Sequence, residues 1–163
     1  MRVSSPSFGN ARLLVALAIY SYWPHNSGLA HIPIGDNTMK LFQNSVVRDN
    51  HRAINNAGDE AENRFPAFRA HRQVSMKGSD GWKPEYFSFY THVASFDIPH
   101  RGRDTESVLE DVFEISNLGP RSARSGSMVR LAPQHSASVG DVIETYGAYY
   151  IVDNVGFSRI EAG

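Results

Sequence analysis

Cysteine is absent from all 163 residues of the chain. This absence excludes disulfide frameworks, thiolate zinc sites, iron–sulfur clusters and cysteine nucleophiles. It leaves the compartment open, because a chain without cysteine folds equally well in reducing and in oxidising surroundings. Any catalytic or metal-binding function must therefore rely on other side chains.

The chain also lacks a strong net charge and a long apolar run. Its 16 basic and 17 acidic residues give a net charge of −1 at pH 7, so the whole chain has no electrostatic attraction to nucleic acid or to an anionic membrane. The apolar run at residues 13–23 is shorter than the about 20 residues that a membrane-spanning helix needs. We therefore expect no membrane partner. The length suits one globular domain and is too short for two domains of typical size.

Motifs that assemble catalytic or cofactor sites are missing as well. The sequence has no Walker A motif, no G-x-G-x-x-G, no G-x-S-x-G and no H-E-x-x-H, so nucleotide, serine-hydrolase and zincin chemistry have no support. The 7 histidines lie far apart in the sequence. Asp97 and His100 form the only compact histidine and carboxylate pair, a weak candidate for metal ligation or general-base work. We predict no cofactor and assign no catalytic residue.

Residues 1–38 are predicted to be an N-terminal extension or linker, followed by a single domain at 39–163. The uncharged run at 13–23 predicts an apolar helix that ends at Pro24, which cannot continue it. The alternative is a secretory signal within residues 1–30, with a basic flank and then small residues near Gly28. We favour a cytoplasmic protein, and secretion is the alternative if that signal is real.

The first half of the domain is predicted to contain strands and one short polar segment. Residues 39–49 combine apolar side chains with a β-branched pair, as in a first strand. Residues 51–62 are polar with turn signals, so a short helix or loop is expected. Residues 65–76 are expected to form a strand that Pro66 confines to an edge or delays. Residues 86–98 alternate with period two and are rich in aromatic and β-branched side chains, which predicts a strand.

The second half has the clearest helix pattern, at residues 105–117. Asp104 and Thr105 are good N-cap residues, and apolar side chains recur at helical spacing. This stripe consists of Val108, Leu109, Val112 and Phe113. Residues 119–138 are rich in serine and arginine without an acid and are expected to form a long mobile loop. Three short strands with tight turns then follow. Together the elements predict an α+β fold: a small antiparallel or mixed sheet, one main amphipathic helix packed on one face and a C-terminal β-meander.

Three segments in the last third carry a resemblance to a known family. They are VLEDVFEISN at 108–117, HSASVGDVI at 135–143 and YYIVDNVGF at 149–157. Residues 105–160 thereby resemble the YodL-like domain of proteins from phages, plasmids and conjugative elements. The resemblance implies the context of a phage or another mobile element. It implies no catalytic residue, because the family offers none to carry over.

Aromatic residues provide the candidate protein-binding site. Trp82, Tyr86 and Tyr90 stand on or beside the predicted aromatic strand, and aromatic side chains are common anchors of protein interfaces. The function that we expect is that of a non-enzymatic accessory protein of a phage or mobile element. It would act by protein–protein interaction with a host or phage protein.

The alternative is a nucleic-acid-binding or anti-defence protein. Residues 64–77 carry cations and no acid, and they are interleaved with aromatic rings, a mixture that single-stranded nucleic acid uses. The serine and arginine loop adds further cations. If both segments lie on one side, the cations form a basic face. The predicted nucleic-acid-binding residues are Arg64, Arg69, Arg72, Lys77, Arg121, Arg124 and Arg130.

Overall fold

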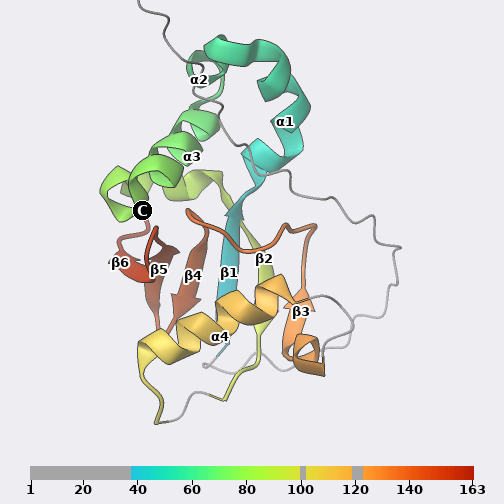
Figure 1. Ribbon diagram of the computed structural model, residues 1–163, viewed down its shortest axis with the longest axis vertical. Coiled ribbons are helices and arrows are strands. Elements are labelled where there is room, and N and C mark those ends of the chain that lie inside the picture. Colours follow the sequence, from blue (N-terminus) through green and yellow to red (C-terminus); the bar gives the residue numbers. More distant parts are fainter. Residues whose placement is uncertain (1–37, 100–101, 119–122) are drawn as a thin grey trace, which may run out of the picture.

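The computed structural model describes residues 38–99, 102–118 and 123–163, which fold around one antiparallel sheet (Figure 1). The strands are β1 (Met39–Asn44), β2 (Tyr90–Phe96), β3 (Met128–Arg130), β4 (Val142–Thr145), β5 (Ala148–Val152) and β6 (Phe157–Ile160). The α-helices are α1 (Ser45–Ala57), α2 (Ala61–Arg64), α3 (Pro66–Lys77) and α4 (Thr105–Asn117). The 3-10 helices are η1 (Gly58–Glu60), η2 (Gly78–Gly81), η3 (Pro84–Phe89) and η4 (Ala123–Ser127). The strand order is β3-β2-β1-β4-β5-β6, and the expected α+β class is confirmed.

One face of the sheet packs against α4, as predicted. Leu41 of the central strand β1 is fully buried and pairs in register with Ala94 of β2 and Ile143 of β4. Figure 1 shows α4 lying across this face. The buried side chains of α4 in the shared core are Val108, Leu109, Val112 and Ile115. The helix begins after Asp104, whose side chain accepts a hydrogen bond of 2.8 Å from the backbone N–H of Ser107, so the predicted N-cap is confirmed.

The opposite face carries a second core that the sequence did not reveal. Val142 and Ile143 are neighbours in β4 and therefore point to opposite faces of the sheet. Ile143 belongs to the core under α4, whereas Val142 packs with Val74 of α3 and Ile151 of β5. Aromatic side chains from the segment between α3 and β2 pack against this second core. Both faces are thus covered, one by α4 and the other by α3 and its neighbours.

The predicted strand at 65–76 is wrong, because these residues form helix α3. Pro66 stands in the first turn, where its missing N–H would have no helical partner in any case. Ala67, Ala70 and Val74 are buried at spacings of three and four residues. The buried face is therefore helical, but its small side chains give a weak hydrophobic signal.

The predicted strands at 39–49 and 86–98 are each only partly strand. The first ends at Asn44, whose side chain accepts a hydrogen bond of 3.1 Å from the backbone N–H of Val47 and caps α1. In the second, Pro84–Phe89 form η3 and the strand β2 begins at Tyr90. The aromatic residues before Tyr90 pack against the second core from a helical turn, so the strand predicted from their period-two pattern is wrong for these residues.

The remaining predictions divide by region. The C-terminal meander of β4, β5 and β6 is confirmed. The segment predicted as a long mobile loop at 119–138 contains η4 and the edge strand β3 in its described part. The predicted apolar helix at 13–23 lies outside the described residues. Among the helices that the structure describes, none combines the length and the apolar character needed to cross a membrane.

Candidate functional site

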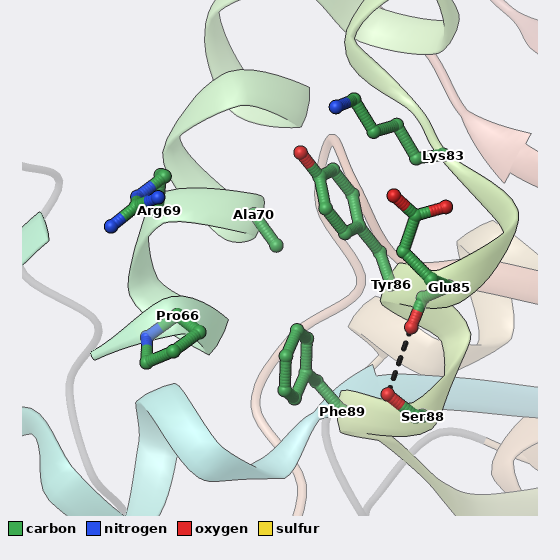
Figure 2. A pocket seen from close by; sticks show the side chains of 8 residues that line it. All are labelled: Pro66, Arg69, Ala70, Lys83, Glu85, Tyr86, Ser88 and Phe89. Carbon is green, nitrogen blue, oxygen red and sulfur yellow. Dashed lines mark hydrogen bonds between the residues drawn. The ribbon is translucent and has the colours of Figure 1, made fainter. Parts of the chain in front are cut away.

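A groove of about 450 Å³ opens between α3 and η3 (Figure 2). Its walls come from two segments that follow each other in the sequence and face each other in space. The lining residues are Pro66, Arg69, Ala70, Lys83, Glu85, Tyr86, Ser88 and Phe89. In Figure 2 the rings of Tyr86 and Phe89 project from η3 toward α3. The groove therefore has aromatic side chains on one wall and the short side chains of Pro66 and Ala70 on the other.

Local sequence explains why each wall has this shape. On α3, Pro66 and Ala70 are four residues apart and so lie on one side of the helix. Ala70 is only 1% exposed, and its small side chain leaves space beside it. On η3, Pro84 starts a short 3-10 helix, and the Ser88 hydroxyl donates a hydrogen bond of 2.8 Å to the Glu85 carbonyl. This turn places Tyr86 and Phe89, which are three residues apart, on the same side.

The three predicted protein-binding residues form one aromatic cluster, in which only Tyr86 lines the groove. The rings of Trp82 and Tyr86 meet edge to face at 6.3 Å, and those of Trp82 and Tyr90 at 5.5 Å. Trp82 donates its indole N–H to the carbonyl of Glu161 at 2.8 Å, and Tyr90 donates its hydroxyl to the carbonyl of Gly140 at 2.8 Å. Burial raises the pKa of Tyr90. Trp82 and Tyr90 thus act as a fixed support behind Tyr86.

Charged side chains stand on the rims of the groove. Arg69 donates from Nε and Nη2 to the backbone carbonyl of Glu62 at 3.1 and 3.0 Å. The Lys83 ammonium lies 5.9 Å from the centre of the Tyr86 ring. Within the described part of the chain, Arg69, Lys83 and Glu85 each lack an ion-pair partner of opposite charge. The rims therefore carry two cations and one anion that no other side chain neutralises.

The remaining predicted nucleic-acid-binding residues of α2 and α3 do not line the groove. Arg72 forms an ion pair with Glu62, the acid that precedes the basic segment. Arg64 lies 5.8 Å from the centre of the Phe65 ring. Lys77 is exposed in the last turn of α3. Among the predicted cations of this segment, only Arg69 lines the groove.

The two basic segments do not combine into one face. Arg124 pairs with Asp111 and Glu114 of α4 at 2.7 and 2.6 Å, so it lies on the side of the sheet opposite α3. Arg130 of β3 stands in register with Ala94, whose side chain belongs to the core under α4. Arg121 lies outside the described residues. Arg124 and Arg130 are therefore separated from the cations of α3 by the thickness of the sheet.

The weak metal candidate gains no support from its surroundings. Asp97 follows β2, and its backbone N–H donates to the carbonyl of Ser127 at 2.8 Å, while His100 lies outside the described residues. In residues 38–99, 102–118 and 123–163, histidine, aspartate and glutamate form no group of three or more suited to holding a metal ion.

A buried polar network was not anticipated from the sequence. The Gln43 side chain of β1 donates to Asp141 Oδ2 at 2.9 Å and to the carbonyl of His135 at 3.1 Å, and it accepts from the backbone N–H of His135 at 3.1 Å. Burial raises the pKa of Asp141 to about 6. A single glutamine in a strand gives no sequence signal of such a role. The network ties the segment before β4 to the central strand.

The groove also contains residues that were not predicted as site residues. Lys83, Glu85 and Phe89 line it with Tyr86, whereas residues 86–98 were predicted to form a strand. The signal that was present is Pro84, which favours the first turn of a helix. A 3-10 helix predicted from Pro84 onward would have placed Tyr86 and Phe89 on the same side of that helix.

Comparison of this chain with family models, with curated proteins and with solved structures finds no match. The resemblance of residues 105–160 to the YodL-like domain therefore stays a prediction.

Proposed function

We propose that this protein is a non-enzymatic accessory protein that acts by protein–protein contact, and that the groove between α3 and η3 is its contact site. The observation that carries the proposal is the placement of Tyr86 and Phe89 in an open groove, with Trp82 and Tyr90 fixed behind Tyr86. The resemblance to the YodL-like domain adds the context of a phage or mobile element. The partner would then be a host or phage protein.

Rigid support for Tyr86 is the physical reason for choosing this surface. A side chain that is already held in place loses little conformational entropy when a partner binds. Tyrosine and tryptophan are enriched among the residues that dominate binding energy, and these residues sit in well-packed pockets. Tyr86 combines partial exposure with edge-to-face packing on Trp82. The groove also has room for a side chain from a partner, since it encloses about 450 Å³.

Nucleic-acid binding is the second candidate, and one observation favours it. Lys83 and Arg69 line the same groove as the rings of Tyr86 and Phe89, and cations beside stacking surfaces are found in single-strand binders. Phosphate contacts make affinity fall steeply with salt concentration. Binding to a nucleic acid that weakens between low and high salt, and that Lys83→Ala reduces, would favour this candidate over protein contact.

Site-specific photo-crosslinking tests the proposed function. Phe89 in the full chain is replaced by p-benzoylphenylalanine, and the protein is irradiated in a lysate of the host cell after nuclease treatment. The same replacement at Tyr146, which is 52% exposed in the turn between β4 and β5, is the control. We expect a discrete protein adduct at position 89 and not at position 146. Equal labelling at both positions, or an adduct only in the absence of nuclease, would contradict the proposal.

A further inference from the structure

We propose that the groove binds an acidic protein segment, which inserts one apolar side chain between Tyr86 and α3 and places carboxylates near Lys83 and Arg69. This inference rests on the proposed function and names the chemistry of the partner. It is carried by two features of the groove, the apolar inner walls and the unneutralised charge on the rims.

The inner walls fit an apolar side chain. Tyr86 and Phe89 face Pro66 and Ala70 across the groove (Figure 2). The walls formed by these four residues are mainly carbon atoms, and the Ser88 hydroxyl is bonded to the backbone carbonyl of Glu85 at 2.8 Å. An apolar side chain placed here would be shielded from water by both walls. This burial is favourable in proportion to the apolar surface area that loses contact with water.

The rims favour negative charge in the occupant. Lys83 stands on the η3 wall and Arg69 on the α3 wall. Several other cations of the described residues have carboxylate partners, among them Lys40 with Glu144 at 3.0 Å and Arg124 with Glu114 at 2.6 Å. Lys83 has only the Tyr86 ring, and Arg69 has only a backbone carbonyl, which carries no net charge. A partner carboxylate would therefore supply the charge that the rims lack.

Glu85 distinguishes an acidic peptide from a nucleic acid. Its carboxylate lies on the same wall as Lys83 and lines the groove, where it would repel any anion placed beside it. A nucleic acid carries a phosphate at every unit and cannot leave this position uncharged. A peptide can instead place separate carboxylates at Lys83 and at Arg69 and present a backbone N–H to Glu85. The neighbouring Arg72 is already paired with Glu62, so few cations remain for a row of phosphates.

Fluorescence polarisation with synthetic peptides tests the inference on the full chain. The probe is a fluorescein-labelled peptide Glu-Asp-Leu-Phe-Glu-Asp, compared with Lys-Lys-Leu-Phe-Lys-Lys, with Glu-Asp-Ala-Ala-Glu-Asp and with a short oligothymidine. We expect the first peptide to bind more tightly than the other three probes. We expect Tyr86→Ala and Lys83→Glu each to weaken that binding by about tenfold, the loss typical of one interface anchor.

Matched control variants separate the groove from general surface effects. Lys77→Glu makes the same charge change as Lys83→Glu on an exposed lysine outside the groove, and we expect it to leave the affinity within about twofold, because surface charges that touch no partner contribute little. Tyr146→Ala removes a tyrosine from the distant turn between β4 and β5. Circular dichroism spectra that match the wild type show that the variants are folded.

Several results would overturn the inference. The first is failure of the acidic peptide to bind at about 1 mM, a concentration at which even weak complexes are detected. The second is an equal loss of affinity in Lys83→Glu and Lys77→Glu. The third is tighter binding of the basic peptide or of oligothymidine than of the acidic peptide. Concentration-dependent dimerisation in sedimentation velocity that Tyr86→Ala abolishes would assign the groove to a second copy instead. Photo-crosslinking at position 89 does not depend on the chemistry of the peptide, so failure of the acidic peptide to bind leaves the proposed function to be tested separately.

Discussion

Replacement of Gly78 by alanine should be among the most damaging small substitutions in this protein. Gly78 links α3 to η2 with φ of +60°, and a Cβ added there would lie 1.7 Å from Oδ1 of Asp153. Hydrogen bonds from Ser79, from Ser158 and from the backbone N–H of Asn154 hold the pKa of Asp153 at about 2. The new methyl group therefore strains the backbone and also displaces an ionised carboxylate from its donors.

The cost can be estimated from these two parts. At φ of +60° and ψ of −139°, a backbone region that L side chains rarely adopt, an alanine costs about 1–3 kcal/mol. A charge-assisted hydrogen bond contributes about 1.5–3 kcal/mol, and the displaced carboxylate loses at least one. We therefore expect Gly78→Ala to lower the free energy of unfolding by about 3–5 kcal/mol, measured by urea denaturation followed by far-ultraviolet circular dichroism.

Gly58 provides a matched control for the backbone part. Its φ is +54° and its ψ is −127°, and an added Cβ would have nothing within 4 Å, so Gly58→Ala should cost only the backbone strain of about 1–3 kcal/mol. In an Asp153→Ala background the cost of Gly78→Ala should fall toward the same value, because the clashing carboxylate is gone. Equal losses for Gly78→Ala and Gly58→Ala in the wild-type background would refute the reasoning.

Three further predictions concern stability. The pKa of buried Asp141 is about 6, above its ordinary value of 3.8, so its ionised form destabilises the fold above pH 6 and this penalty disappears as the pH falls toward 4. Asp141→Asn should therefore raise the unfolding free energy by on the order of 2 kcal/mol at pH 8 and by much less at pH 4.5. A gain that does not change with pH would contradict this prediction. Val74→Ala should lower the unfolding free energy by about 2 kcal/mol in urea denaturation, because Val74 is fully buried against Val142. Met76→Ala on the same helix removes a side chain that is 65% exposed and should cost less than about 0.5 kcal/mol. Similar losses for the two variants would be inconsistent with the second core. Asp104→Ala should lower the thermal unfolding temperature through loss of the α4 cap, and thermal unfolding that matches the wild type would speak against the cap.

Local signals were sufficient where they agreed with one another. In α4 the N-cap residue Asp104, the apolar stripe beginning at Val108 and the observed ends of the helix coincide. The meander was predicted in the same way, because its short β-rich runs are separated by turn residues such as Gly147. In these segments the residues that set the local conformation are also those that pack in the core. One sequence pattern therefore indicates both the secondary structure and the buried face.

Local signals failed where packing decides the conformation. The buried face of α3 consists of Ala67, Ala70 and Val74, which are too small to give a strong helical pattern. The aromatic residues of η3 have high strand propensity, yet they fill the second core from a 3-10 helix that ends one residue before β2. The propensity of such residues depends on what they pack against, and their packing partners, such as Tyr149, lie far away in the sequence.

The sequence by itself determined the exclusion of cysteine chemistry, the α+β class, the helix α4 and the C-terminal strands, because these follow from composition and from contacts between near neighbours. It also selected Arg69 and Tyr86, but as members of two separate hypotheses. Only the tertiary structure joined them in one groove and put Arg124 on the other side of the sheet, paired with α4. The physical reason is that a groove is defined by the distance between two segments, and that distance is set by how α3 and η3 pack on the second core.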